Sequence, residues 1–315
     1  MSEQRIPLIL DVDTGIDDAL ALALAVASPE ADIVAVTTLA GNVDVRRATA
    51  NSLAVLDWLG ANDVPVHNGA SSPLVRDHVD AAFVHGENGL GNADLPSSQR
   101  ATGKDRGPAA IIRLANERPG ELTLVCLGPL TNLAIALNVE PGLGERLRRI
   151  VIMGGAFEVA GNVTPLAEFN VYCDPEAASK VFRSALPDVT VVGLDVTHQT
   201  GLPRVAWEAA GERSSTTARL VFEVCRRTFE ERGMDGFYLH DPLAVAVALD
   251  STLVVTETGS IDVDLDEESR GMTRVAGDGT TRVAKQVDAE RFLASFGEAL
   301  GLPTELMRAP SRSSE

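Results

Sequence analysis

Short apolar runs alternate along the chain with longer stretches that carry a helical pattern. The short runs are rich in β-branched residues and end at polar turns, as buried strands do. They cover residues 6–12, 32–38, 122–127, 149–153 and 189–194. The helical stretches cover residues 17–28, 44–60, 106–118, 130–138, 174–184, 203–210, 214–232, 241–249 and 288–300. This alternation predicts an α/β fold, an open, mostly parallel twisted sheet with helices on both faces and a Rossmann-like core.

Two segments near the end of the chain complete this prediction. Residues 254–287 contain β-branched runs broken by glycines, which predicts a small antiparallel appendage before the last helix. Residues 1–307 are expected to form a single domain. The Ser- and Arg-containing tail, residues 308–315, is expected to be disordered.

Composition and charge narrow the class of protein. A hydrophobic content of 45% over 315 residues is ample for a large core. The formal net charge of −18, without a basic stripe, argues against nucleic acid as a partner. The cysteines, Cys126, Cys173 and Cys225, are too far apart for a CxxC pair, so neither a disulfide framework nor a zinc site is expected. With no signal-like or membrane-spanning apolar run, a cytoplasmic location and no membrane partner are expected.

Carboxylates gather where the first predicted strand ends. Asp11, Asp13, Asp17 and Asp18 lie within eight residues, between two apolar segments. Like charges disfavour each other's ionised forms, and burying them unpaired costs several kcal/mol. A divalent cation would offset that cost, and oxygen-only ligands favour calcium or magnesium. The alternative is a solvated acidic turn that caps the following helix, since Asp is favoured in a first helical turn.

Unusual polar residues also follow the other predicted strands. They are Asn42 after the second, residues 127–132 after the third, and Asn162 with residues 168–170 after the fourth. Ligands of open parallel sheets bind outside the carboxyl ends of the strands, so these stretches point toward one crevice. Ordinary turn chemistry would explain any one of the amides alone.

A further candidate is the sequence His240-Asp241-Pro242 before an apolar helix. Asp241 could simply cap that helix, with Pro242 at its first position. Beside the other acids, however, His240 could donate a proton and Asp241 could ligate a metal.

Taken together, these motifs resemble one family. They are residues 11–18 (DVDTGIDD), 37–42 (TTLAGN), 85–91 (HGENGLG), 127–132 (LGPLTN), 153–155 (MGG), 167–170 (AEFN), 174–177 (DPEA) and 240–242 (HDP). The chain resembles the nucleoside hydrolases (inosine–uridine-preferring nucleoside N-ribohydrolases), whose N-terminal signature is DxDxGxDD. The resemblance implies hydrolysis of the N-glycosidic bond of ribonucleosides, with a small-molecule nucleoside as partner. It also implies a homodimer or homotetramer and a catalytic domain spanning residues 1–307.

The resemblance further implies a role for each matching residue. A bound Ca²⁺ would be held by the carboxylates of Asp13, Asp18 and Asp241 and by the backbone carbonyl of Leu127. Asp13 would act as general base toward a calcium-activated water, and His240 would protonate the departing base. The substrate-binding residues would be Asp17, Asn42, Asn162, Glu168 and Asn170 around the ribose, with His85 and residues 229–238 in loops that close on the base.

Two alternatives remain open at this point. An Asp-x-Asp after an apolar strand is also the nucleophile motif of haloacid-dehalogenase-type phosphohydrolases. That motif requires Thr or Val where Gly15 stands, and no matching lysine or later Asp-Asp pair follows a suitable strand. The other alternative is a catalytically silent nucleoside- or ribose-binding protein on the same fold, which the retention of Asp13 with the full set of acids disfavours.

Overall fold

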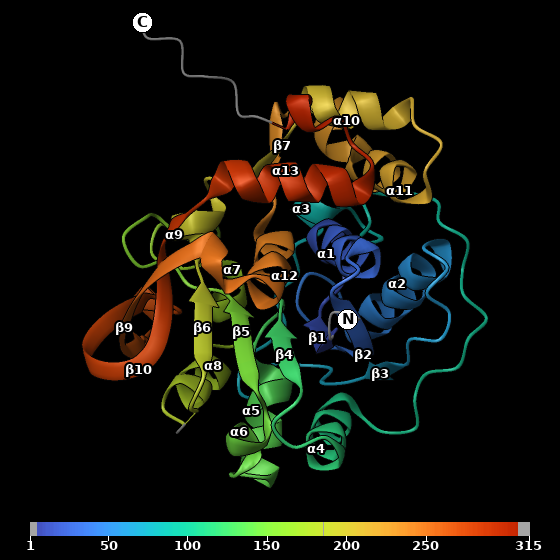
Figure 1. Cartoon of the computed structure of the whole chain (residues 1–315). Coiled ribbons are helices and arrows are strands. Elements are labelled where there is room, and N and C mark those ends of the chain that lie inside the picture. Colours follow the sequence, from blue (N-terminus) through green and yellow to red (C-terminus); the bar gives the residue numbers. More distant parts are fainter. Residues whose placement is uncertain (1–4, 185, 308–315) are drawn as a thin grey trace, which may run out of the picture.

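The fold is built around an eight-stranded, mostly parallel sheet (Figure 1). The structure is a computed structural model that describes residues 5–184 and 186–307, so the expected disordered tail lies outside the described residues. The strands are β1 (Ile6–Val12), β2 (Ala31–Thr38), β3 (Val66–Asn68), β4 (Thr123–Cys126), β5 (Arg149–Met153), β6 (Val189–Val192), β7 (Gly201–Pro203), β8 (Gly236–Tyr238), β9 (Val254–Val263) and β10 (Thr273–Val287). The order in the large sheet is β3-β2-β1-β4-β5-β6-β10-β9, in which the first six strands have the Rossmann order.

The antiparallel segment predicted at residues 254–287 is present as the hairpin of β9 and β10. It is joined to the large sheet, because β10 pairs parallel with β6 through Arg282 and Val283. A separate two-stranded antiparallel sheet is formed by β7 and β8. The mostly parallel sheet with a small antiparallel addition is therefore confirmed.

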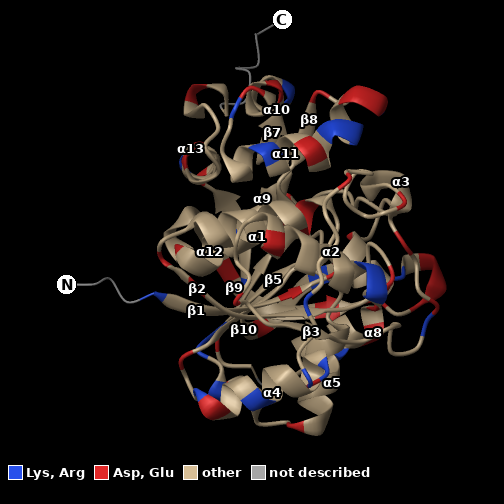
Figure 2. Ribbon diagram, turned by 90° about the vertical axis from the view of Figure 1, so that its right-hand side faces the viewer, with Lys and Arg blue, Asp and Glu red and all other residues tan. Residues whose placement is uncertain are grey.

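Helices cover both faces of the large sheet, as Figure 2 shows with the sheet seen edge-on. The helices are α1 (Ile16–Ala27), α2 (Val45–Trp58), α3 (Ala82–His85), α4 (Gly107–Glu117), α5 (Thr131–Val139), α6 (Leu143–Arg146), α7 (Phe169–Cys173), α8 (Pro175–Phe182), α9 (Leu194–Thr197), α10 (Arg204–Gly211), α11 (Thr216–Arg226), α12 (His240–Leu249) and α13 (Ala289–Leu300). A π-helical turn, Arg227–Glu231, extends α11, and 3₁₀ turns lie at Ser251–Leu253, Glu267–Ser269 and Thr304–Leu306. Helices α1, α11, α12 and α13 pack on one face, and α4, α5 and α8 on the other.

Strand β1 illustrates why the core has two layers. Its side chains alternate, so Leu8, Leu10 and Val12 join the cluster beneath α1 and α12, while Ile9 joins the cluster on the opposite face. All four side chains are fully buried. A strand buried on both faces is continuously apolar, which is the pattern that predicted a parallel sheet.

All five strands predicted from the sequence are present, and the predicted helices agree within two residues except at residues 214–232, where α11 passes into the π-helical turn. The prediction missed β3, β7, β8 and the four- or five-residue helices, which are too short to show a periodicity. Among the described residues, no helix has the length and apolar character needed to cross a bilayer.

Candidate active site

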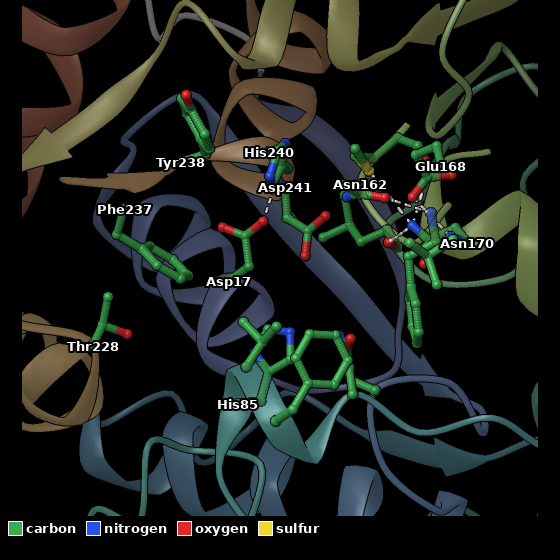
Figure 3. A pocket seen from close by; sticks show the side chains of 18 of the residues that line it. Asp17, His85, Asn162, Glu168, Asn170, Thr228, Phe237, Tyr238, His240 and Asp241 are labelled. Atoms are coloured by element: carbon green, nitrogen blue, oxygen red, sulfur yellow. Dashed lines mark hydrogen bonds between the residues drawn. The ribbon is translucent and has the colours of Figure 1, made fainter. Parts of the chain in front are cut away.

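The candidate site lies where the strand order reverses. Strand β1 is followed by β2 on one side, while β4 pairs with its other side, which leaves a crevice at the carboxyl ends of the strands. A pocket of about 230 Å³ opens there (Figure 3). Its walls come from the first turn of α1, the loops after β2 and β4, α3, the loop before α7, and the segment between the π-helical turn and α12.

The pocket brings together most residues that the sequence singled out. All predicted site residues except Asp13 and Asp18 line it, namely Asp17, Asn42, His85, Leu127, Asn162, Glu168, Asn170, His240 and Asp241. Asp13 and Asp18 are fully buried and contact the pocket residue Asn42. The Asn42 backbone N–H donates to Asp13 Oδ2 over 2.6 Å, and its Nδ2 donates to Asp18 Oδ2 over 3.2 Å. The individual roles of these residues stay predictions.

The turn between β1 and α1 is organised by its own carboxylates. Asp18 Oδ1 accepts the Asp13 N–H over 3.1 Å, and Asp18 Oδ2 accepts the Gly15 N–H over 2.9 Å. These contacts satisfy backbone donors at the start of α1, where the helix dipole also favours negative charge. Asp17 Oδ2 accepts the Asp241 N–H over 3.1 Å, which joins two positions 224 residues apart.

Asp13 is held in a slot between two glycines. A Cβ added at Gly41 would overlap Asp13 Oδ2, and one added at Gly128 would lie 2.8 Å from Asp13 Oδ1. Gly41 belongs to the loop after β2, and Gly128 to the loop after β4. Two neighbouring loops therefore approach the carboxylate as closely as only glycine allows.

With the catalytic role that the resemblance implies for Asp13, Gly41→Ala is expected to displace this carboxylate and to lower kcat by about 10²-fold, because a misplacement of about 1 Å has a cost of that size. Steady-state kinetics would measure the loss. The matched control is Gly142→Ala, where an added Cβ meets only Glu140 Oε1, at 3.6 Å. Normal kinetics for Gly41→Ala would show that the slot tolerates a methyl group and that Asp13 need not stay in place.

The opposite wall of the pocket is built on Glu168 and Asn170. The Glu168 carboxylate accepts the backbone N–H groups of Gly155, Asn170 and Val171 over 3.1, 2.7 and 3.0 Å. Asn170 Nδ2 donates to the backbone carbonyl of Leu127 over 2.6 Å. Asn162 lies nearer the surface, and its Oδ1 accepts the Phe169 N–H over 2.9 Å. Carboxylates and amides with these fixed orientations provide both donors and acceptors for a polyol.

The buried carboxylates favour a cation. Burial, followed by the charge of Asp18, raises the pKa of Asp13, and burial together with the neighbouring acids raises the pKa of Asp241. Asp13 Oδ1 and Asp17 Oδ1 are buried and have no hydrogen-bond partner among the described residues. Carboxylate and carbonyl oxygens suit a hard divalent ion. Within the described ranges no group of three or more Asp, Glu, His or Cys side chains is arranged to hold a metal ion.

His85 has a fixed tautomer. The backbone N–H of Ile16 donates to His85 Nδ1 over 3.0 Å. A backbone N–H can only donate, so the proton of the neutral ring lies on Nε2. Burial, and then the charges of Arg232 and Arg227, lower the pKa of His85 to about 3. At neutral pH, His85 is an uncharged N–H donor.

His240 lines the pocket from the start of α12. Its Nδ1 lies 2.7 Å from Thr197 Oγ1. Burial, and then His198 and His85, lower the pKa of His240 to about 3. The ring is therefore neutral at pH 7, and once protonated it is a strong acid.

Two features of the site were not predicted from the sequence. One is the set of hydrogen bonds made by Asp11, and the other is the exposed residue at the rim of the pocket. Asp11 Oδ1 accepts Thr37 Oγ1 over 2.5 Å and Asn132 Nδ2 over 2.7 Å, and burial raises its pKa to about 7. These bonds tie together β1, β2 and the start of α5. The sequence did contain a signal for these hydrogen bonds, because Asp11 begins the acidic motif (residues 11–18), while Thr37 and Asn132 lie in the motifs at residues 37–42 and 127–132. Phe83, 62% exposed at the rim, had no such signal.

Comparison with known proteins shows the family and rules out the phosphohydrolase alternative. The family model described as inosine-uridine preferring nucleoside hydrolase matches residues 8–294. The chain belongs to the nucleoside hydrolase family. The resemblance found in the sequence is thereby confirmed, and the chain is a nucleoside hydrolase rather than a phosphohydrolase.

Several relatives of this nucleoside hydrolase cover almost its whole length. The inosine-uridine preferring nucleoside hydrolase of Leishmania major is 36% identical over 305 residues, which are 93% of this chain and 96% of the relative. A pyrimidine-specific ribonucleoside hydrolase of Salmonella arizonae is 39% identical over 307 residues, covering 94% and 98%. A uridine nucleosidase of Arabidopsis thaliana is 39% identical over 262 residues, covering 82% and 78%.

Solved structures agree with this assignment. A plant nucleoside hydrolase superimposes with a TM-score of 0.89 at 37% identity, covering 94% of this chain and 99% of that one. A purine-preferring ribonucleoside hydrolase from Gardnerella vaginalis superimposes with a TM-score of 0.88 at 36% identity, covering 96% and 99%. The names of these relatives include both purine and pyrimidine preferences, so family membership alone leaves the base open.

Proposed function

We propose that this nucleoside hydrolase cleaves the N-glycosidic bond of ribonucleosides in the pocket beside β1, releasing ribose and the free base. The observation that supports this proposal is a set of buried carboxylates beside oriented amides and two histidines. Three of these carboxylates, those of Asp11, Asp13 and Asp17, have an oxygen with no hydrogen-bond partner among the described residues. A product assay with inosine, adenosine, guanosine, uridine and cytidine tests the proposal and ranks the bases. Release of no reducing sugar from any of the five would contradict it.

We propose Ca²⁺ as the metal, held by Asp13, Asp18, Asp241 and the carbonyl of Leu127. The donor set consists only of oxygens, and the acids have no basic side chain hydrogen-bonded to them among the described residues. When bound, the ion supplies Lewis acidity that makes a water molecule a better nucleophile. The Leu127 carbonyl already accepts from Asn170 but has a second lone pair for a cation.

Each side chain of the site then has a separate role in the hydrolysis. Asp13 accepts the proton of the attacking water as general base. Asp17 and Asn170 hold the ribose 2′- and 3′-hydroxyls, Asn162 and Glu168 hold the 5′-hydroxyl, and Asn42 lies on the same side. The buried acids also stabilise the oxocarbenium-like charge that develops on the ribose in the transition state. His85 would contact the substrate through its Nε2–H.

Asp17→Ala is expected to weaken the use of ribonucleosides, lowering kcat/KM by roughly 10- to 150-fold, since a hydrogen bond to a charged group is lost. The matched comparison is inosine against 2′-deoxyinosine with both enzymes. If Asp17 holds the 2′-hydroxyl, the wild type discriminates between the two substrates and the variant does so much less. Equal discrimination by both enzymes would remove Asp17 from the 2′-hydroxyl.

His240→Ala is expected to lower kcat for inosine by about 10²–10⁴-fold with little change in KM, because proton donation to the leaving base acts mainly in the transition state. Turnover of p-nitrophenyl riboside should hardly change, because its leaving group needs no proton. If both substrates lose turnover alike, His240 acts through its neighbour Asp241 and another residue activates the leaving group.

Two expectations extend beyond the pocket. We propose a homodimer or homotetramer, which light scattering on the purified protein would test. The three free, buried cysteines among the described residues are compatible with the proposed cytoplasmic location.

A further inference from the structure

Thr197 contacts the pocket residue His240 but does not itself line the pocket. It ends α9, which follows β6, and it is fully buried. Its Oγ1 lies 2.7 Å from His240 Nδ1. Within the described part of the chain this is the one hydrogen bond of the Thr197 hydroxyl, whose partner is therefore the imidazole alone.

Ring packing alone cannot orient His240. The rings of His198 and Tyr238 lie with their centroids 5.7 Å from that of His240, and 4.7 Å from each other. These contacts restrict the plane of the imidazole. An imidazole turned by half a revolution about its χ2 bond has nearly the same shape, so packing distinguishes Nδ1 from Cδ2 only weakly. A hydrogen-bonding partner on one side makes that distinction.

The other pocket histidine is held in the same way. The backbone N–H of Ile16 donates to His85 Nδ1 over 3.0 Å, and the Thr197 hydroxyl is the partner of His240 Nδ1. In both rings Nε2 is the nitrogen left for the substrate.

We propose that Thr197 is a positioning residue of the hydrolytic reaction. Its hydroxyl fixes the His240 ring with Nδ1 turned toward α9, so that Nε2–H is presented to the leaving base. This inference rests on the proposed role of His240 as the group that assists departure of the base.

The test compares three variants with the wild type. Thr197→Val keeps the shape and removes the hydroxyl, Thr197→Ser keeps the hydroxyl, and Thr200→Val is the matched control. Thr200 is equally buried in the same segment, but its hydroxyl donates to the backbone carbonyl of Thr197 over 3.0 Å rather than to a histidine. Thermal unfolding of all three establishes that each is folded.

With inosine, Thr197→Val should lose about 10²-fold in kcat, the size expected for a misplaced catalytic group, with KM changed little. Thr197→Ser should restore most of the rate, and Thr200→Val should resemble the wild type. With p-nitrophenyl riboside all of these enzymes should turn over at similar rates. Adding Thr197→Val to His240→Ala should cause no further loss, because Thr197 acts only through the histidine.

Three results would overturn the proposal. They are a normal kcat of Thr197→Val on inosine, an equal loss on both substrates, or a further loss in the double variant. Failure of the proposed function gives a different result, since the wild-type enzyme would then release no ribose from any nucleoside.

Discussion

Asp13→Asn is expected to remove nearly all turnover while the protein stays folded and still binds ribonucleosides. The amide is isosteric with the carboxylate but cannot accept a proton from water, and loss of a general base lowers kcat by about 10²–10⁴-fold. KM should change much less, because Asp17 and Asn170 remain on the pocket wall. The new amide would also face the Asn42 N–H that now donates to Asp13 Oδ2 over 2.6 Å, and it can accept that bond through its own oxygen.

Single-turnover kinetics and nucleoside titration would separate these two effects. The matched control is Asp44→Asn, since Asp44 caps α2 on the surface and Asn caps a helix equally well. A near-normal kcat for Asp13→Asn would show that another group takes the proton. Loss of binding together with turnover would instead indicate that Asp13 serves mainly to shape the ribose site.

Removing divalent cations is expected to abolish turnover and to destabilise the fold. The pH dependence of the free energy of unfolding should have opposite signs in the metal-free and the metal-loaded protein. In the metal-free protein, burial raises the pKa values of Asp13, Asp17, Asp18 and Asp241. The native state then binds more protons than the unfolded chain, so its stability falls as the pH rises from about 4 toward neutrality. A bound cation keeps these groups ionised and reverses the sign, so the loaded protein loses stability as the pH falls toward 4.

The melting temperatures of loaded and chelated protein should therefore diverge between pH 5 and pH 8. An ion present at about 100 times its Kd adds about 2.7 kcal/mol to the free energy of unfolding, which is several degrees for a protein of this size. Elemental analysis should find about one calcium per chain, and Ca²⁺ should restore the chelated enzyme better than Mg²⁺. Active protein without any divalent metal, or melting temperatures that stay parallel with pH, would contradict the proposal.

The sequence predicted the sheet well because its strands are buried on both faces. Continuous apolar runs such as residues 6–12 can hardly be anything else when polar turns and helical patterns flank them. The edge strand β3, Val66–Asn68, has only three residues and one neighbour, so no periodicity marks it. The sequence also did not show that β10 pairs with β6, because a hairpin looks the same whether or not it joins a larger sheet.

The site was predictable as a set of residues rather than as a geometry. Residues that follow adjacent parallel strands must come together, which is why Asp17, Asn42 and Leu127 line one pocket. Partners that arrive from elsewhere had no signal. Nothing in the local sequence links Thr197 to His240 or Ile16 to His85, because both contacts depend on how distant elements pack.

The hydrogen bond between Asp17 and the Asp241 N–H has a consequence for the folding kinetics of the chain. It closes a loop of more than 200 residues, and such distant contacts form late because the entropic cost of closing the loop comes first. Strands β1, β2, β4 and β5 can pair before α12 is in place, since their partners are nearer in sequence. A refolding chain would therefore acquire most of its secondary structure while it is still inactive. The rate at which enzymatic activity returns would then report the docking of α12 onto a preformed sheet.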